Sequence, residues 1–184
     1  MLIGNRQTFA IECHHEPIPN DSRWVFGRMC LWCDGNPLGN IEEAACMLNV
    51  TEGFLQSLIQ RLDALDDPAL RQIGDRAAFD FLDHALYGDH ERSSEQIVAD
   101  ATRFRKFDLL TNGGESFDDS KSFIIGDGDC LRILFVEYEP GPGQTYKSFA
   151  SARINRSDFI AVVRTFLDWM ENEKNATHAA PSRL

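Results

Sequence analysis

The chain has 184 residues, of which 43% are hydrophobic and 26% charged, and its formal net charge is −11. That length suits a single unit with its own hydrophobic core, and the composition is ordinary for a soluble globular protein. The acidic balance argues against a nucleic-acid partner, because binding to phosphates needs lysine and arginine to displace counterions. It is compatible with a basic protein partner, which a negative field attracts.

The sequence predicts neither membrane insertion nor export. Every apolar run is shorter than the ~20 residues that cross a bilayer, so no membrane partner is expected. The first residues lack a basic stretch followed by an apolar core, and we therefore expect a cytoplasmic location. The five cysteines are an odd number, and in that compartment they are expected to be reduced thiols.

Two strands are expected near the N-terminus, over residues 8–13 and 24–32. In the first, the apolar residues share one face, which suits burial. In the second, apolar side chains line both faces, with Arg28 as an exception on one of them. A tight turn at 34–37 and a short edge strand at 37–40 follow them.

A helical insertion is predicted after these strands, because the spacing of apolar residues changes from two to about 3.6. It covers residues 41–106 and separates two groups of strands. Gly88 is placed to end one of its helices in the left-handed conformation. The expected helices are 41–48, 51–65, 75–87 and a fourth that begins at Ser93 or Ser94.

The longest β-forming run is Cys130 to Glu139, which is apolar on both of its faces. Such a strand usually lies in the middle of a sheet. Ser122 to Ile125 precede it across a turn rich in glycine and aspartate, and Thr145 to Ile154 follow two prolines that interrupt pairing. Residues 121–155 are therefore predicted to form an antiparallel meander in the middle of one sheet.

A long helix is predicted over residues 155–174, with an apolar stripe and with Asn155 as its cap. We expect it to pack on the sheet, and we expect residues 175–184 to be a disordered tail. The predicted fold is therefore one α+β domain over residues 1–174. It has a mostly antiparallel sheet of about five or six strands, the helical insertion and the C-terminal helix.

Cysteine and histidine are concentrated near the N-terminus, where Cys13, His14, Cys30 and Cys33 have the side chains of a zinc site. On a strand, Cys30 and Cys33 point to opposite faces, so they reach one metal ion only if a turn begins at Cys33. Buried thiols are the simpler interpretation. A small metal-binding or hydrolytic enzyme that uses these residues is the alternative hypothesis.

The sequence contains no recognisable catalytic motif, and we predict neither an enzyme nor a cofactor. His84 and His90 flank the end of an expected helix, where a surface histidine interacts well with the helix dipole. Asp127-Gly128-Asp129 resembles part of a calcium loop, but the remaining ligands are missing and a hairpin turn is the simpler interpretation.

Carboxylates are spread through the helical insertion. Most such residues only solvate a helix face, but if they converge they present an acidic surface to a basic ligand. The residues predicted first for partner binding are Asp80, Asp83, Asp89 and Glu91. Reversing their charges is expected to change both the affinity for the partner and its salt dependence.

Several short segments resemble the bacterial immunity proteins grouped as immunity protein 42. The most distinctive are Met1 to Asn5, Phe9 to Glu12 and Trp24 to Gly27. Leu131 to Phe135 and Phe159 to Trp169 are compatible with the same pattern, so the resemblance spans most of residues 1–170.

The resemblance implies an immunity protein that neutralises the cognate toxin of a polymorphic toxin system by direct, stoichiometric binding. The acidic charge of the chain makes a basic toxin domain the expected partner. The resemblance supplies no catalytic residues and leaves out the cysteine-rich N-terminal region. A structural or adaptor module is a third hypothesis, which only interaction data would distinguish from the first.

Overall fold

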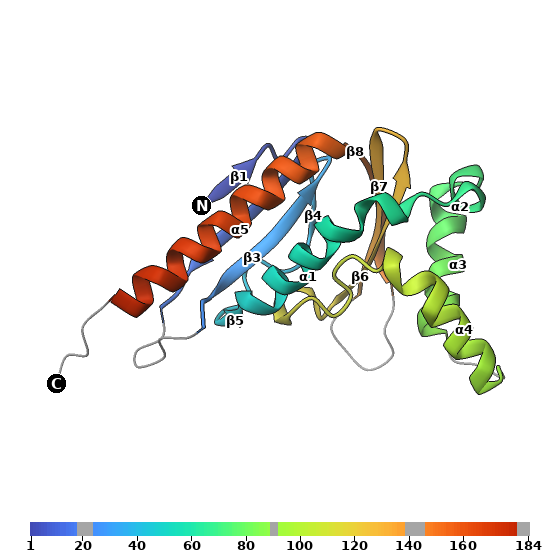
Figure 1. Cartoon of the computed structure of the whole chain (residues 1–184), viewed down its shortest axis with the longest axis horizontal. Helices are drawn as coiled ribbons and strands as arrows, with labels where there is room; N and C mark the ends of the chain where they lie inside the picture. The colour runs from blue at the N-terminus through green and yellow to red at the C-terminus, as the bar shows by residue number, and fades with distance from the viewer. Residues whose placement is uncertain (18–23, 89–91, 139–145, 180–184) are drawn as a thin grey trace.

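The computed structural model describes residues 1–17, 24–88, 92–138 and 146–179. Within these residues the chain forms two antiparallel sheets and five α-helices (Figure 1). The predicted α+β class and the antiparallel pairing are confirmed. In Figure 1 the N-terminus and the end of α5 lie towards one end of the molecule, and helices α2, α3 and α4 lie at the other.

The first sheet is formed by the N-terminal strands. Its strands are β1 (Leu2–Gly4), β2 (Phe9–His15), β3 (Phe26–Cys33), β4 (Asn36–Leu38) and β5 (Cys46–Met47). They pair in the order β1-β2-β3-β4, and β5 pairs with the other end of β3. Asp34 and Gly35 connect β3 to β4 with φ values of 51° and 77°, which suit the twist of a two-residue hairpin.

The second sheet is the predicted meander of β6 (Ser120–Asp127), β7 (Cys130–Tyr138) and β8 (Tyr146–Asn155). As expected, β7 is the central strand and is buried on both faces. The expectation that the meander forms the middle of one larger sheet is wrong, because β6 and β8 do not pair with the first sheet in the described residues. The eight described strands divide into two sheets that share one core.

The helical insertion is confirmed from residue 48 onwards. The α-helices are α1 (Leu48–Arg61), α2 (Pro68–Gln72), α3 (Asp75–Tyr87), α4 (Ser94–Phe104) and, after the meander, α5 (Arg156–Ala179). Short 3-10 turns are η1 (Leu62–Leu65), η2 (Arg105–Phe107) and η3 (Glu115–Phe117). The helix expected over 41–48 is wrong, because Ala45 has a φ of 56° and the next two residues pair with β3.

Side-chain caps begin two helices of the insertion, whereas α1 and α3 begin without one. Ser93 caps α4 in a capping box with Gln96, and Asp67 caps α2 with a proline in its first turn. Gly88 ends α3 in an extended conformation, with φ −60° and ψ 138°, so the predicted left-handed cap is wrong.

The C-terminal helix α5 begins as predicted, because the Asn155 side chain accepts a hydrogen bond from the backbone N–H of Ser157 at 2.9 Å. It continues to Ala179, so residues 175–179 are helical where a disordered tail was expected. Ion pairs from Lys174 to Glu52 at 2.8 Å and to Glu171 at 3.0 Å stabilise this last part. Residues 180–184 lie outside the described residues.

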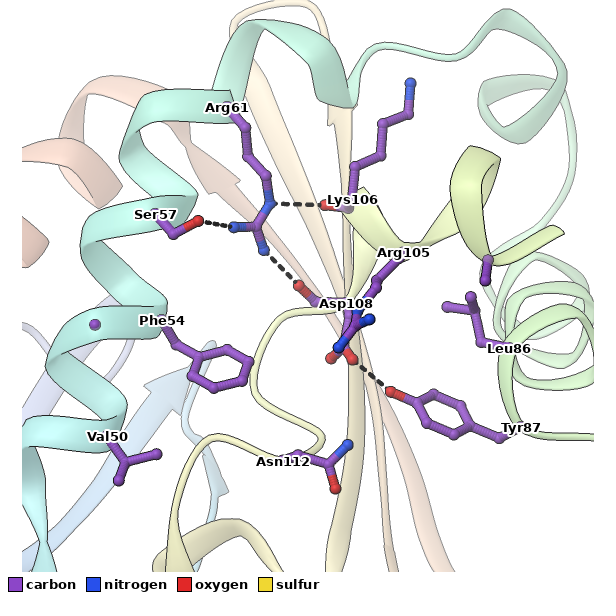
Figure 2. A pocket seen from close by; sticks show the side chains of 12 residues that line it. Val50, Phe54, Ser57, Arg61, Leu86, Tyr87, Arg105, Lys106, Asp108 and Asn112 are labelled. Atoms are coloured by element: carbon purple, nitrogen blue, oxygen red, sulfur yellow. Dashed lines mark hydrogen bonds between the residues drawn. The ribbon is translucent and has the colours of Figure 1, made fainter. Parts of the chain in front are cut away.

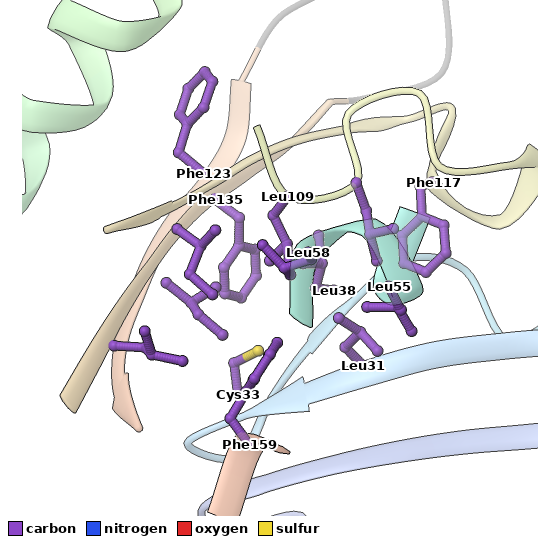
Figure 3. Close-up of a cluster of buried hydrophobic side chains, with 14 of the residues drawn as sticks. Leu31, Cys33, Leu38, Leu55, Leu58, Leu109, Phe117, Phe123, Phe135 and Phe159 are labelled. Carbon is purple, nitrogen blue, oxygen red and sulfur yellow. The ribbon is translucent and has the colours of Figure 1, made fainter. Parts of the chain in front are cut away.

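The hydrophobic core lies where the two sheets meet α1 and α5 (Figure 3). Both helices lie on the same side of the first sheet, and α5 crosses β1 and β2 (Figure 1). The ring of Phe159 on α5 lies 4.7 Å from that of Phe9 on β2, measured between centroids. The second sheet contributes Phe135, and α1 contributes Leu55 and Leu58. Among the described residues, every helix is too short or too polar to cross a bilayer.

Candidate functional site

A groove of about 770 Å³ lies between α1 and the α3–α4 pair (Figure 2). One wall belongs to α1, the opposite wall belongs to α3 and α4, and the segment from η2 to Asn112 forms the floor. We call this the α1–α4 groove. Its lining residues are Val50, Gly53, Phe54, Ser57, Arg61, Leu86, Tyr87, Ala101, Arg105, Lys106, Asp108 and Asn112.

Arg61 fixes the floor of the groove to α1. Its guanidinium donates to the backbone oxygens of Lys106 at 3.1 Å and Asp108 at 3.0 Å. It also donates to Ser57 Oγ at 2.9 Å, one turn back on α1. Burial lowers the pKa of Arg61, but an arginine remains charged at neutral pH. The cation is therefore committed to internal hydrogen bonds that hold the groove together.

Tyr87 and Asp108 connect the floor to α3. The Tyr87 hydroxyl donates to Asp108 Oδ2, and the backbone N–H of Thr111 donates to Oδ1 at 3.1 Å. Thr111 is bonded in turn to Ser122 on β6, whose N–H donates to its hydroxyl at 3.1 Å. Burial and the nearby Asp108 charge raise the pKa of Tyr87, so the phenol stays neutral. Both carboxylate oxygens of Asp108 are thus satisfied within the protein.

Replacing Tyr87 with phenylalanine is expected to lower the free energy of unfolding by about 2 kcal/mol, because Asp108 loses a hydrogen bond in a site shielded from water. The pKa of Tyr87 is higher in the folded than in the unfolded protein, so the neutral phenol stabilises the fold. This contribution to the free energy of unfolding is complete below the unfolded pKa of about 10, and it is lost as the pH rises towards the folded pKa. Urea denaturation at pH 7 and pH 10.5 measures both effects. The variant should lose less stability between these pH values than the parent, and an equal loss would contradict the assignment.

Two further cations line the groove at the end of α4. Arg105 and Lys106 begin η2, and the Lys106 ammonium lies 4.9 Å from the centre of the Phe107 ring. Within the described residues neither one forms an ion pair. The groove therefore combines an apolar pair of walls, through Phe54 and Leu86, with two cations. Arg105 lies on the floor beside Asp108, whereas Lys106 lies at the edge and its side chain points away from Asp108 (Figure 2).

Comparison with protein families gives a match to immunity protein 42 over residues 1–169. The chain belongs to the immunity protein 42 family. The match runs through the cysteine-rich N-terminal region, which the sequence resemblance had left out. Comparison with curated proteins gives no match.

Among solved structures, this family member is similar to the crystal structure of CdiI from Burkholderia dolosa AUO158. The two chains are 18% identical and superpose with a TM-score of 0.65, over 92% of this chain and 99% of the other. At that identity the likeness shows a shared fold. The fold therefore extends over nearly all of both proteins.

The carboxylates predicted to bind the partner of this immunity protein are already engaged where the structure describes them. Asp80 forms an ion pair with Arg76 at 2.9 Å, one turn back on α3. Asp83 is half-buried and accepts from Lys121 Nζ on β6 at 2.6 Å. Asp89 and Glu91 lie outside the described residues. Partner binding by these four residues stays a prediction.

The four residues of the alternative metal site lie on both sides of the first sheet. Cys13 and Cys33 point into the core, whereas His14 and Cys30 belong to the opposite face. In the part of the chain that the structure describes, no three metal-ligating side chains come together. Burial raises the pKa of Cys13 and of Cys30 to about 12 and raises that of Cys33 as well, which disfavours the thiolate that a metal needs.

The thiols are expected to differ in reactivity, because four cysteines are buried and Cys130 is half-exposed. With a disulfide reagent at pH 8, we expect Cys130 to react in the native protein and the other four to react after denaturation. A Cys130→Ser variant should remove the native reaction. Zinc analysis of protein purified without added zinc is the companion measurement, and a stoichiometric ion would support the alternative enzyme hypothesis.

The groove itself was not predicted from the sequence. Its lining comes from residues more than twenty positions apart, such as Phe54, Tyr87 and Asp108. One signal was present, because Arg103, Arg105 and Lys106 form a basic run in a strongly acidic chain. A run of cations at the end of a helix has an ordinary explanation in the helix dipole, so the signal alone was not distinctive.

Proposed function

We propose that this protein neutralises a cognate toxin by direct, stoichiometric binding in the cytoplasm of the cell that produces the toxin. The observation that carries the proposal is the family match over residues 1–169. The shared fold with CdiI from Burkholderia dolosa supports it.

The chemistry of the groove fits a binding role. Three of its polar side chains, Arg61, Tyr87 and Asp108, are hydrogen-bonded to one another or to the backbone, so they shape a surface rather than activate a substrate. Occupation of the toxin's own surface is therefore the mechanism that we propose, without a chemical step.

The net charge of −11 supports a toxin domain of opposite net charge. A negative field accelerates the encounter with a cationic domain, and salt screens that field over about 10 Å at 0.1 M. We therefore propose a basic toxin domain, with neither nucleic acid nor membrane as a partner. The association rate constant is expected to fall as ionic strength rises.

Where the gene that adjoins the gene for this chain encodes a large secreted protein, the test uses the C-terminal domain of that protein as the toxin domain. Co-expression of that domain with this chain should restore growth, and co-expression with an unrelated immunity protein should not. Titration of the purified domain should end at one chain per toxin. Protection at substoichiometric amounts would indicate an enzyme, binding without protection would indicate an adaptor, and the absence of both would overturn the proposal.

A further inference from the structure

We propose that the α1–α4 groove, continued along the exposed side of α4, is the surface that receives the toxin, and that it binds a segment with an apolar side chain next to a carboxylate. This inference rests on the proposed function and assigns it a place on the molecule. It differs from the acidic surface that the sequence suggested, because the charge at this site is positive.

The first observation is the exposed apolar surface of α4. Only Phe104 is buried in this helix, while Ile97 and Val98 are 45% and 64% exposed. Both precede Ala101, which lines the groove, by three or four residues and therefore lie on the same side of the helix. Val50 adds a further exposed apolar side chain on the opposite wall. Apolar side chains that gather at the rim of a groove indicate an interaction surface.

The second observation is the charge of the groove. In a chain with an excess of negative charge, most described cations are bound to carboxylates. Those in ion pairs are Arg6, Arg28, Arg76, Arg92, Lys121, Arg132, Arg153, Arg156 and Lys174. Arg105 and Lys106 have no such partner among the described residues, although both line a concave site. A carboxylate on the toxin would supply the missing charge.

The size of the groove limits what enters it. Pockets of about 300 to 1,000 Å³ hold small ligands or a few side chains, and the groove has about 770 Å³. Phe54 and Leu86 lie on opposite walls, so an apolar side chain that enters the groove would lie between them (Figure 2). Such a buried anchor, surrounded by a rim that excludes water, is the usual source of affinity at a protein interface.

The local charge and the overall charge have separate roles in this proposal. The net negative field attracts a basic toxin domain from a distance. The positive charge of the groove then fixes its orientation, because a misplaced cation would meet Arg105 and Lys106 at close range. A toxin with net positive charge and one exposed acidic segment satisfies both requirements.

The experiment compares two double charge reversals. Arg105→Glu with Lys106→Glu changes the groove, and Arg103→Glu with Arg71→Glu makes the same change in net charge outside it. Arg103 lines a different hollow, beside Leu70 and Phe104. The probe is the purified toxin domain named above, and binding is measured by calorimetry at 0.15 M salt. We expect a loss of affinity on the order of 30-fold or more for the groove variant and about threefold or less for the control.

A third variant tests the apolar rim without altering charge. Ile97→Ser with Val98→Ser is expected to weaken binding on the order of tenfold, and thermal unfolding should be almost unchanged because both side chains are exposed. A comparison variant, Asp80→Lys, examines the acidic surface predicted from the sequence.

The outcomes separate this inference from the function on which it rests. If the parent chain fails to bind the toxin, the proposed function fails. If the parent binds and the groove variant binds equally well, or loses no more than the control, the inference is wrong. A loss confined to Asp80→Lys would place the interface on the acidic surface. Dissociation of a homodimer by the groove variant would show that a second copy of this chain occupies the site.

Discussion

Replacing Phe159 with alanine is expected to lower the free energy of unfolding by about 4 kcal/mol. The side chain is fully buried where α5 crosses the first sheet, and its ring lies 4.7 Å from that of Phe9. Removing it leaves a cavity that the rigid sheet cannot close, so both the transfer energy and the packing contacts are lost. For a chain of this size the melting temperature should fall by roughly 12 °C. Urea denaturation followed by tryptophan fluorescence measures the change.

The matched control is Phe81→Ala, the same substitution on the surface of α3. Phe81 is 45% exposed and contacts Phe104 edge to face at 5.0 Å between ring centroids. Removing this ring is expected to lower the free energy of unfolding by about 1 kcal/mol, because much of the ring is already in water. Equal effects of the two substitutions would show that Phe159 does not pack α5 against Phe9 of the first sheet.

The second large effect is expected for Arg132→Met, which should lower the free energy of unfolding by about 3 kcal/mol. Arg132 is only 7% exposed on β7, and its guanidinium donates to the backbone oxygens of Leu70 at 2.9 Å and Ile73 at 3.2 Å. It also bonds twice to the Asp75 carboxylate at the start of α3, at 2.5 and 2.8 Å. One side chain thus joins the second sheet to α2 and α3. Methionine fills a similar volume, but it takes the side-chain donor away from both backbone oxygens and leaves Asp75 with the hydrogen bond from Ser151 alone.

The control for this substitution is Arg153→Met on the neighbouring strand. Arg153 lies opposite Arg132 in the β7–β8 register, but its side chain is 62% exposed and its ion pair with Asp127 is in contact with water. We expect Arg153→Met to change the free energy of unfolding by less than about 1 kcal/mol. If Arg153→Met costs as much as Arg132→Met, burial is not the reason for the effect.

The Arg132 contribution should also depend on pH. Burial favours the neutral form of Asp75, but hydrogen bonds from Ser151 and Arg132 outweigh it and lower the pKa of Asp75. A carboxyl group with a lowered folded pKa adds stability above its unfolded pKa of about 3.9, and this stability is lost as the pH falls through the folded value. The difference between the parent and Arg132→Met should therefore shrink below about pH 4.

The contacts of Arg132 also help to hold the groove in place. Arg132 fixes the start of α3, and the same helix carries Leu86 and Tyr87 at its other end. The groove walls are therefore supported by contacts within the core, while Ile97 and Val98 on α4 are not part of it. Substitutions on α4 can test binding without disturbing the fold, which is why the proposed interface is open to a clear experiment.

Elements that depend on neighbouring residues could be predicted from the sequence. The stripe of α5, its Asn155 cap and the Ser93 capping box all follow from side chains within a few positions of one another. The two-sided apolar pattern of β7 likewise indicated a central strand. The helix expected at 41–48 failed because its amphipathic spacing was weaker than the pairing of Cys46 and Met47 with β3, a contact remote in sequence.

The sequence by itself determined the α+β class, the meander, the starts of α3, α4 and α5 and the resemblance to an immunity family, because each depends on residues within a few positions of one another. Only the tertiary structure decided that the strands divide into two sheets, that Cys13 and Cys30 face opposite ways, and that Phe54, Tyr87 and Arg105 meet around one groove. The physical reason is that a surface is formed by residues from separate elements, and their meeting depends on how whole helices and sheets bury their apolar faces against each other.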